Sequence, residues 1–174
     1  MPENLPAYLT YKQARLSELR DALSSAKPTP TELTVTARVA GGSGVRPVQV
    51  REFTIVTDSS AALAGHNLGP TAPELLLSAL ASCLAHTFLI AATNEGITYE
   101  MLEVEVRGTI DFRGILEVST DAPVAPQNIT YEARMAVNAG AEQLTRLQFE
   151  VERLCPVLQA LTQALAVKGR IVRQ

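Results

Sequence analysis

Residues 75 to 94 form the longest stretch of the chain without a charged side chain, and this stretch limits the available folds most strongly. Its length is about that of a helix crossing a bilayer, so a membrane helix must be considered. Three features argue against a membrane helix. The stretch contains the polar residues Ser78, Ser82, His86 and Thr87, and an acidic residue lies at each end, Glu74 and Glu95. No basic residue is present at either end to anchor the helix at the membrane surface. We therefore expect a buried central helix over about residues 72 to 93 and no membrane partner.

The sequence also marks the ends of this helix. Thr71 is a suitable N-cap, and Pro73 and Glu74 fall in the first turn, where a missing N–H costs little and a carboxylate suits the helix dipole. Gly96, after Asn94 and Glu95, predicts the C-terminal end.

The composition is that of a globular protein of one domain. Of the 174 residues, 47% are hydrophobic and 19% are charged, which is enough to build a core. A net charge of -3, no basic run and few aromatic residues argue against a nucleic-acid partner. The first residues carry charges throughout and do not form a basic patch followed by an apolar core, so we expect a cytoplasmic protein without a secretory signal.

Alternation of apolar and polar residues predicts strands at residues 33–39, 48–57, 102–112 and 129–137. The sequence Gly41-Gly42-Ser43-Gly44 is a turn signal between the first two. The alternation changes parity near Arg51-Glu52, which indicates either a bulge or a third strand.

Helical spacing of apolar residues predicts further helices at 5–25, 141–154 and 157–166. The sequence Lys27-Pro28-Thr29-Pro30 ends the first, and Pro156 separates the other two. Residues 167–172 are expected to form a closing strand. The element order is therefore β-β(-β)-α-β-β-α-α-β.

The only two cysteines, Cys83 and Cys155, are expected to be reduced in a cytosolic protein. Cys83 shares a stripe of the central helix with apolar residues, which by itself favours an inert buried thiol. Cys155 precedes a helix break, where unpaired N–H groups of the next helix can stabilise a thiolate, but core packing is the simpler interpretation. Taken singly, neither cysteine predicts an enzyme.

Metal and cofactor sites are not expected. His86 follows Cys83 by three residues, but a Cys-x-x-His pair needs two further ligands that the sequence does not offer. The chain contains no CxxC, GxGxxG, P-loop or GxSxG motif.

Two sequence motifs favour reactive cysteines over inert ones. The segment from Gly69 to Cys83, GPTAPELLLSALASC, resembles the first cysteine signature of the OsmC/Ohr family, which has the form GPNPxELLLAALGAC. The Cys155-Pro156-Val157 segment, at the start of a short helix after a longer one, resembles the second. The element order matches as well. The resemblance covers about residues 30–174, the OsmC-like domain, and leaves residues 1–29 as an N-terminal helical arm.

The resemblance implies an α+β fold in which antiparallel sheets wrap around central helices in an intertwined homodimer. It also implies a thiol-dependent peroxidase that reduces organic hydroperoxides to alcohols. Cys83 would be oxidised to a sulfenic acid, and Cys155 would condense with it to a disulfide. A dithiol such as dihydrolipoamide or a lipoylated protein would reduce that disulfide again.

A Cys83 thiolate needs a cation nearby, and the family's peroxidases use an Arg and a Glu at this site. Glu74 occupies the family's Glu position in the ELLL-type subgroup. Among the arginines of the first hairpin, Arg51 is the first choice, Arg38 the second, and Arg46 the remaining candidate. For each of them, an exposed strand charge is the alternative interpretation.

Two other functions remain open on the same fold. A non-enzymatic redox-sensing or small-ligand-binding stress protein would form the disulfide slowly, without turnover. A thiol enzyme of other chemistry, such as sulfur transfer, would carry a persulfide on one cysteine.

Overall fold

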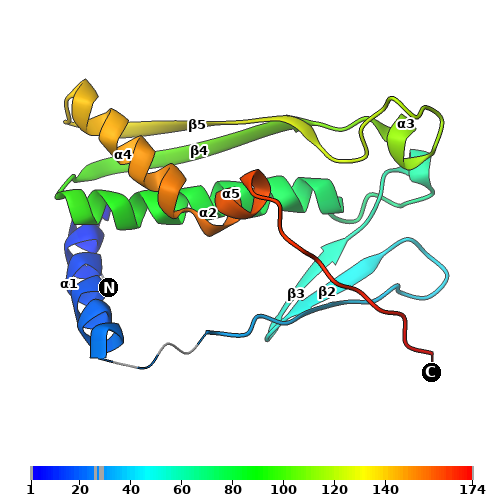
Figure 1. Cartoon of the computed structure of the whole chain (residues 1–174), viewed down its shortest axis with the longest axis horizontal. Helices are drawn as coiled ribbons and strands as arrows, with labels where there is room; N and C mark the ends of the chain where they lie inside the picture. Colours follow the sequence, from blue (N-terminus) through cyan, green and yellow to red (C-terminus); the bar gives the residue numbers. More distant parts are fainter. Residues whose placement is uncertain (1, 26, 28–29, 174) are drawn as a thin grey trace. The chain divides into compact units, whose positions relative to one another are not determined.

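A computed structural model describes residues 2–25, 27 and 30–173 (Figure 1). The chain divides into two compact units. The cysteine unit comprises Met1–Leu16, Leu80–Glu105 and Tyr131–Gln174, and the hairpin unit comprises Ser17–Ala79 and Val106–Thr130. Helices and antiparallel sheets are both present, so the fold class is α+β, as expected.

The hairpin unit contains a three-stranded antiparallel sheet in the order β1-β2-β3, made of Val35–Ala37, Arg46–Val50 and Phe53–Thr57 (Figure 1). Val50 lies opposite both Val35 and Phe53, which fixes the register of all three strands. Arg51 and Glu52 form the turn between β2 and β3, and Arg51 has a φ of 52°. The parity change in the sequence therefore marks a third strand.

The loop after β3 is tied to the buried side chain of Asp58. One carboxylate oxygen, Oδ2, accepts hydrogen bonds from the backbone N–H groups of His66 (2.8 Å) and Leu68 (3.2 Å). Gly69 then passes so close to β3 that a Cβ atom on it would lie 2.1 Å from the carbonyl oxygen of Val56. A glycine is therefore required where the chain turns toward the next helix. A 3₁₀ turn, Ala61–Leu63, lies within this loop.

The central helix α2 runs over Ala72–Glu95, close to the expected bounds. At its C-terminal end, Gly96 has a φ of 68°, and the N–H of Ile97 donates to the carbonyl of Ala92 (2.9 Å). This left-handed ending is the one that a glycine favours. α2 is long and apolar enough to span a membrane by length and composition alone. Its C-terminal part instead contributes core residues to the cysteine unit, namely Leu80, Leu84, Thr87, Phe88, Ala91, Ala92 and Thr93.

Two long strands follow, β4 (Tyr99–Thr109) and β5 (Gln127–Val137), which pair in a two-stranded sheet and run in opposite directions (Figure 1). The expected strand to residue 112 ends earlier, because the Asp111 side chain accepts from the N–H of Arg113 and caps a short helix α3, Phe112–Ile115. In β5, alternate residues from Ile129 to Val137 are half-buried and those between them exposed, as the alternation predicts.

The remaining helices are α1 (Leu5–Ser25), α4 (Ala141–Leu154) and α5 (Pro156–Thr162). The predicted bounds of α1 and α4 are confirmed, while α5 is shorter than expected. Of the residues predicted to end α1, Pro28 and Thr29 lie outside the described part of the chain.

The predicted closing strand at residues 167–172 is wrong for this chain: residues 163–173 form neither helix nor strand. A strand needs a neighbour to pair its backbone groups, and the two sheets found among the described residues do not include this segment.

Candidate functional site

The cysteine unit brings the two thiols together. Cys83 lies near the middle of α2 and is half-buried, and Cys155 lies between α4 and α5 and is completely buried. Both are free thiols, and they are close enough that the side chain of Cys155 raises the pKa of Cys83. Two residues that are far apart in sequence are thus neighbours in the cysteine unit.

Pro156 explains why the chain breaks at Cys155. The residue before a proline is kept out of the helical region, and Cys155 has an extended conformation (φ -76°, ψ 110°) that ends α4 and begins α5. Its N–H still donates to Val151 (3.0 Å), and its carbonyl accepts from the N–H of Gln159 (2.9 Å). The backbone of Cys155 is therefore hydrogen-bonded both to α4 and to α5.

The surroundings of Cys83 act on its thiol in opposite directions. Burial is the largest influence and raises the pKa of Cys83, and the neighbouring Cys155 raises it further. The backbone N–H of Val157, in the first turn of α5, and the hydroxyl of Thr87 lower the pKa of Cys83, but the net shift is upward. Cys83 therefore rests as a thiol, and a further cation is needed to make it a thiolate.

A polar cluster lies beside the pair. The hydroxyl of Tyr131, on β5, donates to Oε1 of Glu152 (2.7 Å), and the Gln148 amide donates to the same oxygen (2.9 Å). Burial, followed by Glu152 and to a smaller extent Cys155, raises the pKa of Tyr131. No sequence pattern predicted this cluster. Its signals were Tyr131 at an inward position of β5 and Glu152 one helical turn before Cys155.

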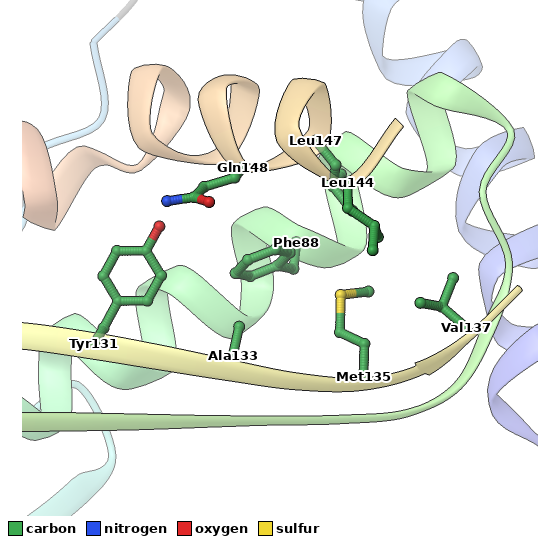
Figure 2. Close-up of a pocket in the computed structure, with 8 residues that line it drawn as sticks. All are labelled: Phe88, Tyr131, Ala133, Met135, Val137, Leu144, Leu147 and Gln148. Atoms are coloured by element: carbon green, nitrogen blue, oxygen red, sulfur yellow. The ribbon is translucent and has the colours of Figure 1, made fainter. Parts of the chain in front are cut away.

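Tyr131 and Gln148 form the polar end of a cavity of about 320 Å³ between β5, α4 and α2. Figure 2 shows the phenol and the amide facing each other across this end. The rest of the wall is apolar and consists of Phe88, Ala133, Met135, Val137, Leu144 and Leu147. Such a cavity has the chemistry to receive an apolar group with a polar end.

Glu74 and the candidate arginines belong to the hairpin unit. Glu74 forms a capping box with Thr71: its carboxylate accepts from the Thr71 N–H (2.7 Å) and hydroxyl (2.8 Å). These two bonds, the N–H bond first, lower the pKa of Glu74. The structure thus gives Glu74 a defined structural role, starting α2.

Arg51, the first choice from the sequence, is an exposed turn residue whose guanidinium lies 5.2 Å from the centre of the Phe53 ring. Arg46 instead lines a cavity of about 560 Å³ together with Glu74, and its guanidinium contacts the hydroxyl of Ser59 (3.5 Å). Arg38 is exposed. Within the hairpin unit, Arg46 is therefore the candidate that shares a cavity with Glu74.

His86 contacts the arm and not a metal-ligand cluster. Lys12, a buried residue of α1, places its Nζ 3.1 Å from Nε2 of His86. Desolvation, and then the charge of Lys12, lower the pKa of His86. Within the described part of the chain, no group of three or more His, Cys, Asp or Glu side chains is arranged to hold a metal ion.

The family model of OsmC-like protein matches residues 65–169, which is more than half of the chain and includes both cysteines. The chain belongs to the OsmC-like family. A search of the curated proteins finds no match to this sequence.

Solved OsmC-like structures share the fold. An OsmC-like protein from Mycoplasma pneumoniae aligns with a TM-score of 0.66 at 21% identity, covering 77% of this chain and 89% of that one. An organic hydroperoxide resistance protein OsmC from Legionella pneumophila gives 0.61 at 12%, covering 77% and 91%. The organic hydroperoxide resistance protein OhrB of Bacillus subtilis gives 0.51 at 17%, covering 75% and 90%. At these identities the likeness establishes the fold alone.

Proposed function

We propose that this protein is a thiol-dependent peroxidase that reduces organic hydroperoxides to alcohols. The observation that carries the proposal is that Cys83 and Cys155 are neighbours in the cysteine unit, close enough for Cys155 and the backbone N–H of Val157 to shift the pKa of Cys83. A peroxidatic and a resolving cysteine must be neighbours, so that the sulfenic acid of one can condense with the thiol of the other to a disulfide. The names of the Legionella pneumophila and Bacillus subtilis proteins, which refer to organic hydroperoxide resistance, support the substrate class.

The proposed cycle has three steps. The Cys83 thiolate attacks the distal oxygen of the hydroperoxide, the O–O bond breaks, and the alkoxide leaves as the alcohol after taking a proton. Cys155 then attacks the Cys83 sulfenic acid, which forms the S–S bond and releases water. A dithiol such as dihydrolipoamide or a lipoylated protein reduces the disulfide by exchange and is itself oxidised to a disulfide.

The first step needs a cation, since burial raises the pKa of Cys83. We propose an arginine of the hairpin unit in this role, with Glu74 as the carboxylate that orients it. Arg51 is the candidate from the sequence, and Arg46 is supported by the cavity that it shares with Glu74. Comparing Arg46→Ala, Arg51→Ala and Arg38→Ala identifies the residue, because only the replacement of the activating arginine lowers the rate of sulfenic acid formation.

We propose that the protein acts as an intertwined homodimer in the cytoplasm. β3 supports this, since Phe53 and Ile55 on one face and Val56 on the other are 54%, 40% and 42% exposed. A sheet with exposed apolar side chains on both faces gains stability when another chain covers it. Sedimentation of the reduced protein measures its oligomeric state.

A redox-sensing protein without turnover is the second candidate. It is supported by the raised pKa of Cys83 and by the complete burial of Cys155, both of which slow thiol chemistry. On this alternative, an oxidant converts the two thiols to the Cys83–Cys155 disulfide, and adding a dithiol does not lead to continued consumption of the oxidant.

The deciding experiment follows the consumption of cumene hydroperoxide with dihydrolipoamide as the reductant. We expect steady turnover by the natural protein, none by Cys83→Ser, and a sulfenic acid that dimedone traps in Cys155→Ser. Full activity in Cys83→Ser contradicts the mechanism. Formation of the disulfide without turnover identifies the redox sensor.

A further inference from the structure

At the junction between α4 and α5, one backbone carbonyl lacks the N–H group that would donate to it in a continuous helix. In a continuous helix the carbonyl of Glu152 accepts from the N–H of residue 156, but Pro156 has no N–H. The side-chain amide of Gln159 occupies this place and donates to the Glu152 carbonyl at 2.8 Å. Gln159 thus ties the start of α5 to the end of α4 across the break.

The side chain of Glu152 is tied to a different element. Its Oε1 accepts from the hydroxyl of Tyr131 on β5 (2.7 Å), and Gln148 donates to the same oxygen (2.9 Å). Glu152 is therefore held by α5 through its backbone and by β5 through its carboxylate. These bonds come from segments that are distant in sequence, so they fix the junction against the body of the cysteine unit.

The junction carries two of the groups that influence the pKa of Cys83, namely Cys155 and the backbone N–H of Val157. Cys155 lies one turn after Glu152, and the backbone N–H of Val157, two residues further on, is close enough to Cys83 to lower its pKa. Any movement of the junction moves both groups away from Cys83 together. The position of Glu152 therefore sets how often Cys155 is within reach of Cys83.

We propose that Glu152 is a positioning residue for the cysteine pair, held by Tyr131 and Gln159, and that it sets the stability and rate of formation of the Cys83–Cys155 disulfide. The inference deepens the proposed function, since disulfide formation is the second step of that cycle. The bond forms when the Cys155 sulfur displaces hydroxide from the Cys83 sulfenic acid, with water as the product. A looser junction lowers the effective concentration of Cys155 at that sulfur.

The test uses Tyr131→Phe and Gln159→Ala, each of which removes one of the bonds to Glu152. Tyr99→Phe is the matched control, because the buried Tyr99 hydroxyl has no hydrogen-bond partner within the described part of the chain. The disulfide is formed with diamide and equilibrated against dithiothreitol buffers. We expect Tyr131→Phe and Gln159→Ala to lower the equilibrium constant for the disulfide about tenfold, which corresponds to a potential about 30 mV more oxidising. We expect Tyr99→Phe to leave it unchanged.

A further variant distinguishes the positioning role of the Glu152 side chain from an effect of its negative charge. Glu152→Gln keeps an oxygen that accepts from Tyr131 and Gln148, so we expect its disulfide to be nearly as stable as that of the natural protein. A shift in Glu152→Gln as large as in Tyr131→Phe overturns the positioning role, and so does an unchanged potential in both Tyr131→Phe and Gln159→Ala. If Gln159→Ala does not fold, Tyr131→Phe, which loses a single oxygen atom, decides the outcome.

The diamide measurement needs no hydroperoxide, so it tests Glu152 even if the peroxidase proposal fails. With a hydroperoxide, the same variants should accumulate more dimedone-labelled Cys83 before the disulfide forms. If the natural protein forms the disulfide with a normal potential but consumes no hydroperoxide, only the peroxidase proposal is rejected. If turnover is normal and the disulfide potentials of Tyr131→Phe and Gln159→Ala are both unshifted, only the role of Glu152 is rejected.

Discussion

The hydroxyl of Thr87 donates to the backbone carbonyl of Cys83 at 2.8 Å, one helical turn earlier in α2. The same hydroxyl is one of the two groups that lower the pKa of Cys83 against the larger effect of burial. Thr87 therefore lies where it can turn from the carbonyl toward a thiolate as the charge forms.

Replacing Thr87 by Val should make Cys83 less reactive, because the thiolate loses a donor and the pKa of Cys83 rises further. A hydrogen bond has a net value of about 0.5–1.5 kcal/mol, so alkylation at neutral pH should slow by up to about tenfold. The measurement is the pH dependence of iodoacetamide labelling in a Cys155→Ser background. Thr93→Val is the control, since Thr93 makes the same bond to Leu89 (2.6 Å) further along α2. Equal slowing in both variants would argue against a direct effect of Thr87.

Replacing Glu74 by Ala should destabilise the fold by about 1 kcal/mol, because the Thr71 N–H loses its capping partner. The pKa of Glu74 is lowered in the folded state. Its contribution is therefore present above the usual Glu pKa of 4.5 and is lost as the pH falls through the lowered value. Urea unfolding at several pH values measures this. Glu142→Ala, in the first turn of α4, should show a smaller loss of stability.

Replacing Gly69 by Ala should destabilise the protein by about 1–3 kcal/mol, the usual cost of overpacking. The added Cβ would meet the backbone carbonyl of Val56, which cannot move without displacing β3. Gly42→Ala is the matched control, since a Cβ there meets nothing within 4 Å. The free energies of unfolding of the two variants are compared in urea. Equal stability of both would show that the loop before α2 adjusts freely.

Replacing Lys12 by Met should raise the pKa of His86 toward its usual value of 6.5, because a positive charge next to the imidazole is removed. Since folding lowers this pKa, the stability gained from neutral His86 is present above pH 6.5 and is lost as the pH falls below it. NMR titration of the His86 ring measures the shift. Lys168→Met, in the exposed tail, should leave the titration unchanged. No shift in Lys12→Met would mean that desolvation alone lowers the pKa.

Local patterns predicted most of the elements because their causes are local. Thr71 and Glu74 mark the start of α2 and form the expected capping box, and Gly96 ends the helix with a positive φ. Pro156 ends α4 at the expected residue. The strand expected at residues 167–172 failed for the opposite reason, since an apolar, β-branched sequence does not supply the neighbouring strand that it needs.

The sequence by itself determined the OsmC-like family, through the segment from Gly69 to Cys83 and the Cys155-Pro156 pair, and it marked both cysteines as the residues to examine. Tertiary structure alone decided that the two cysteines are neighbours, that Tyr131 and Gln159 bond to Glu152, and that Arg46 shares a cavity with Glu74. The physical reason is that spacing along one helix or strand fixes which side chains share a face. Which faces meet depends on how separate elements pack, and no local pattern encodes that.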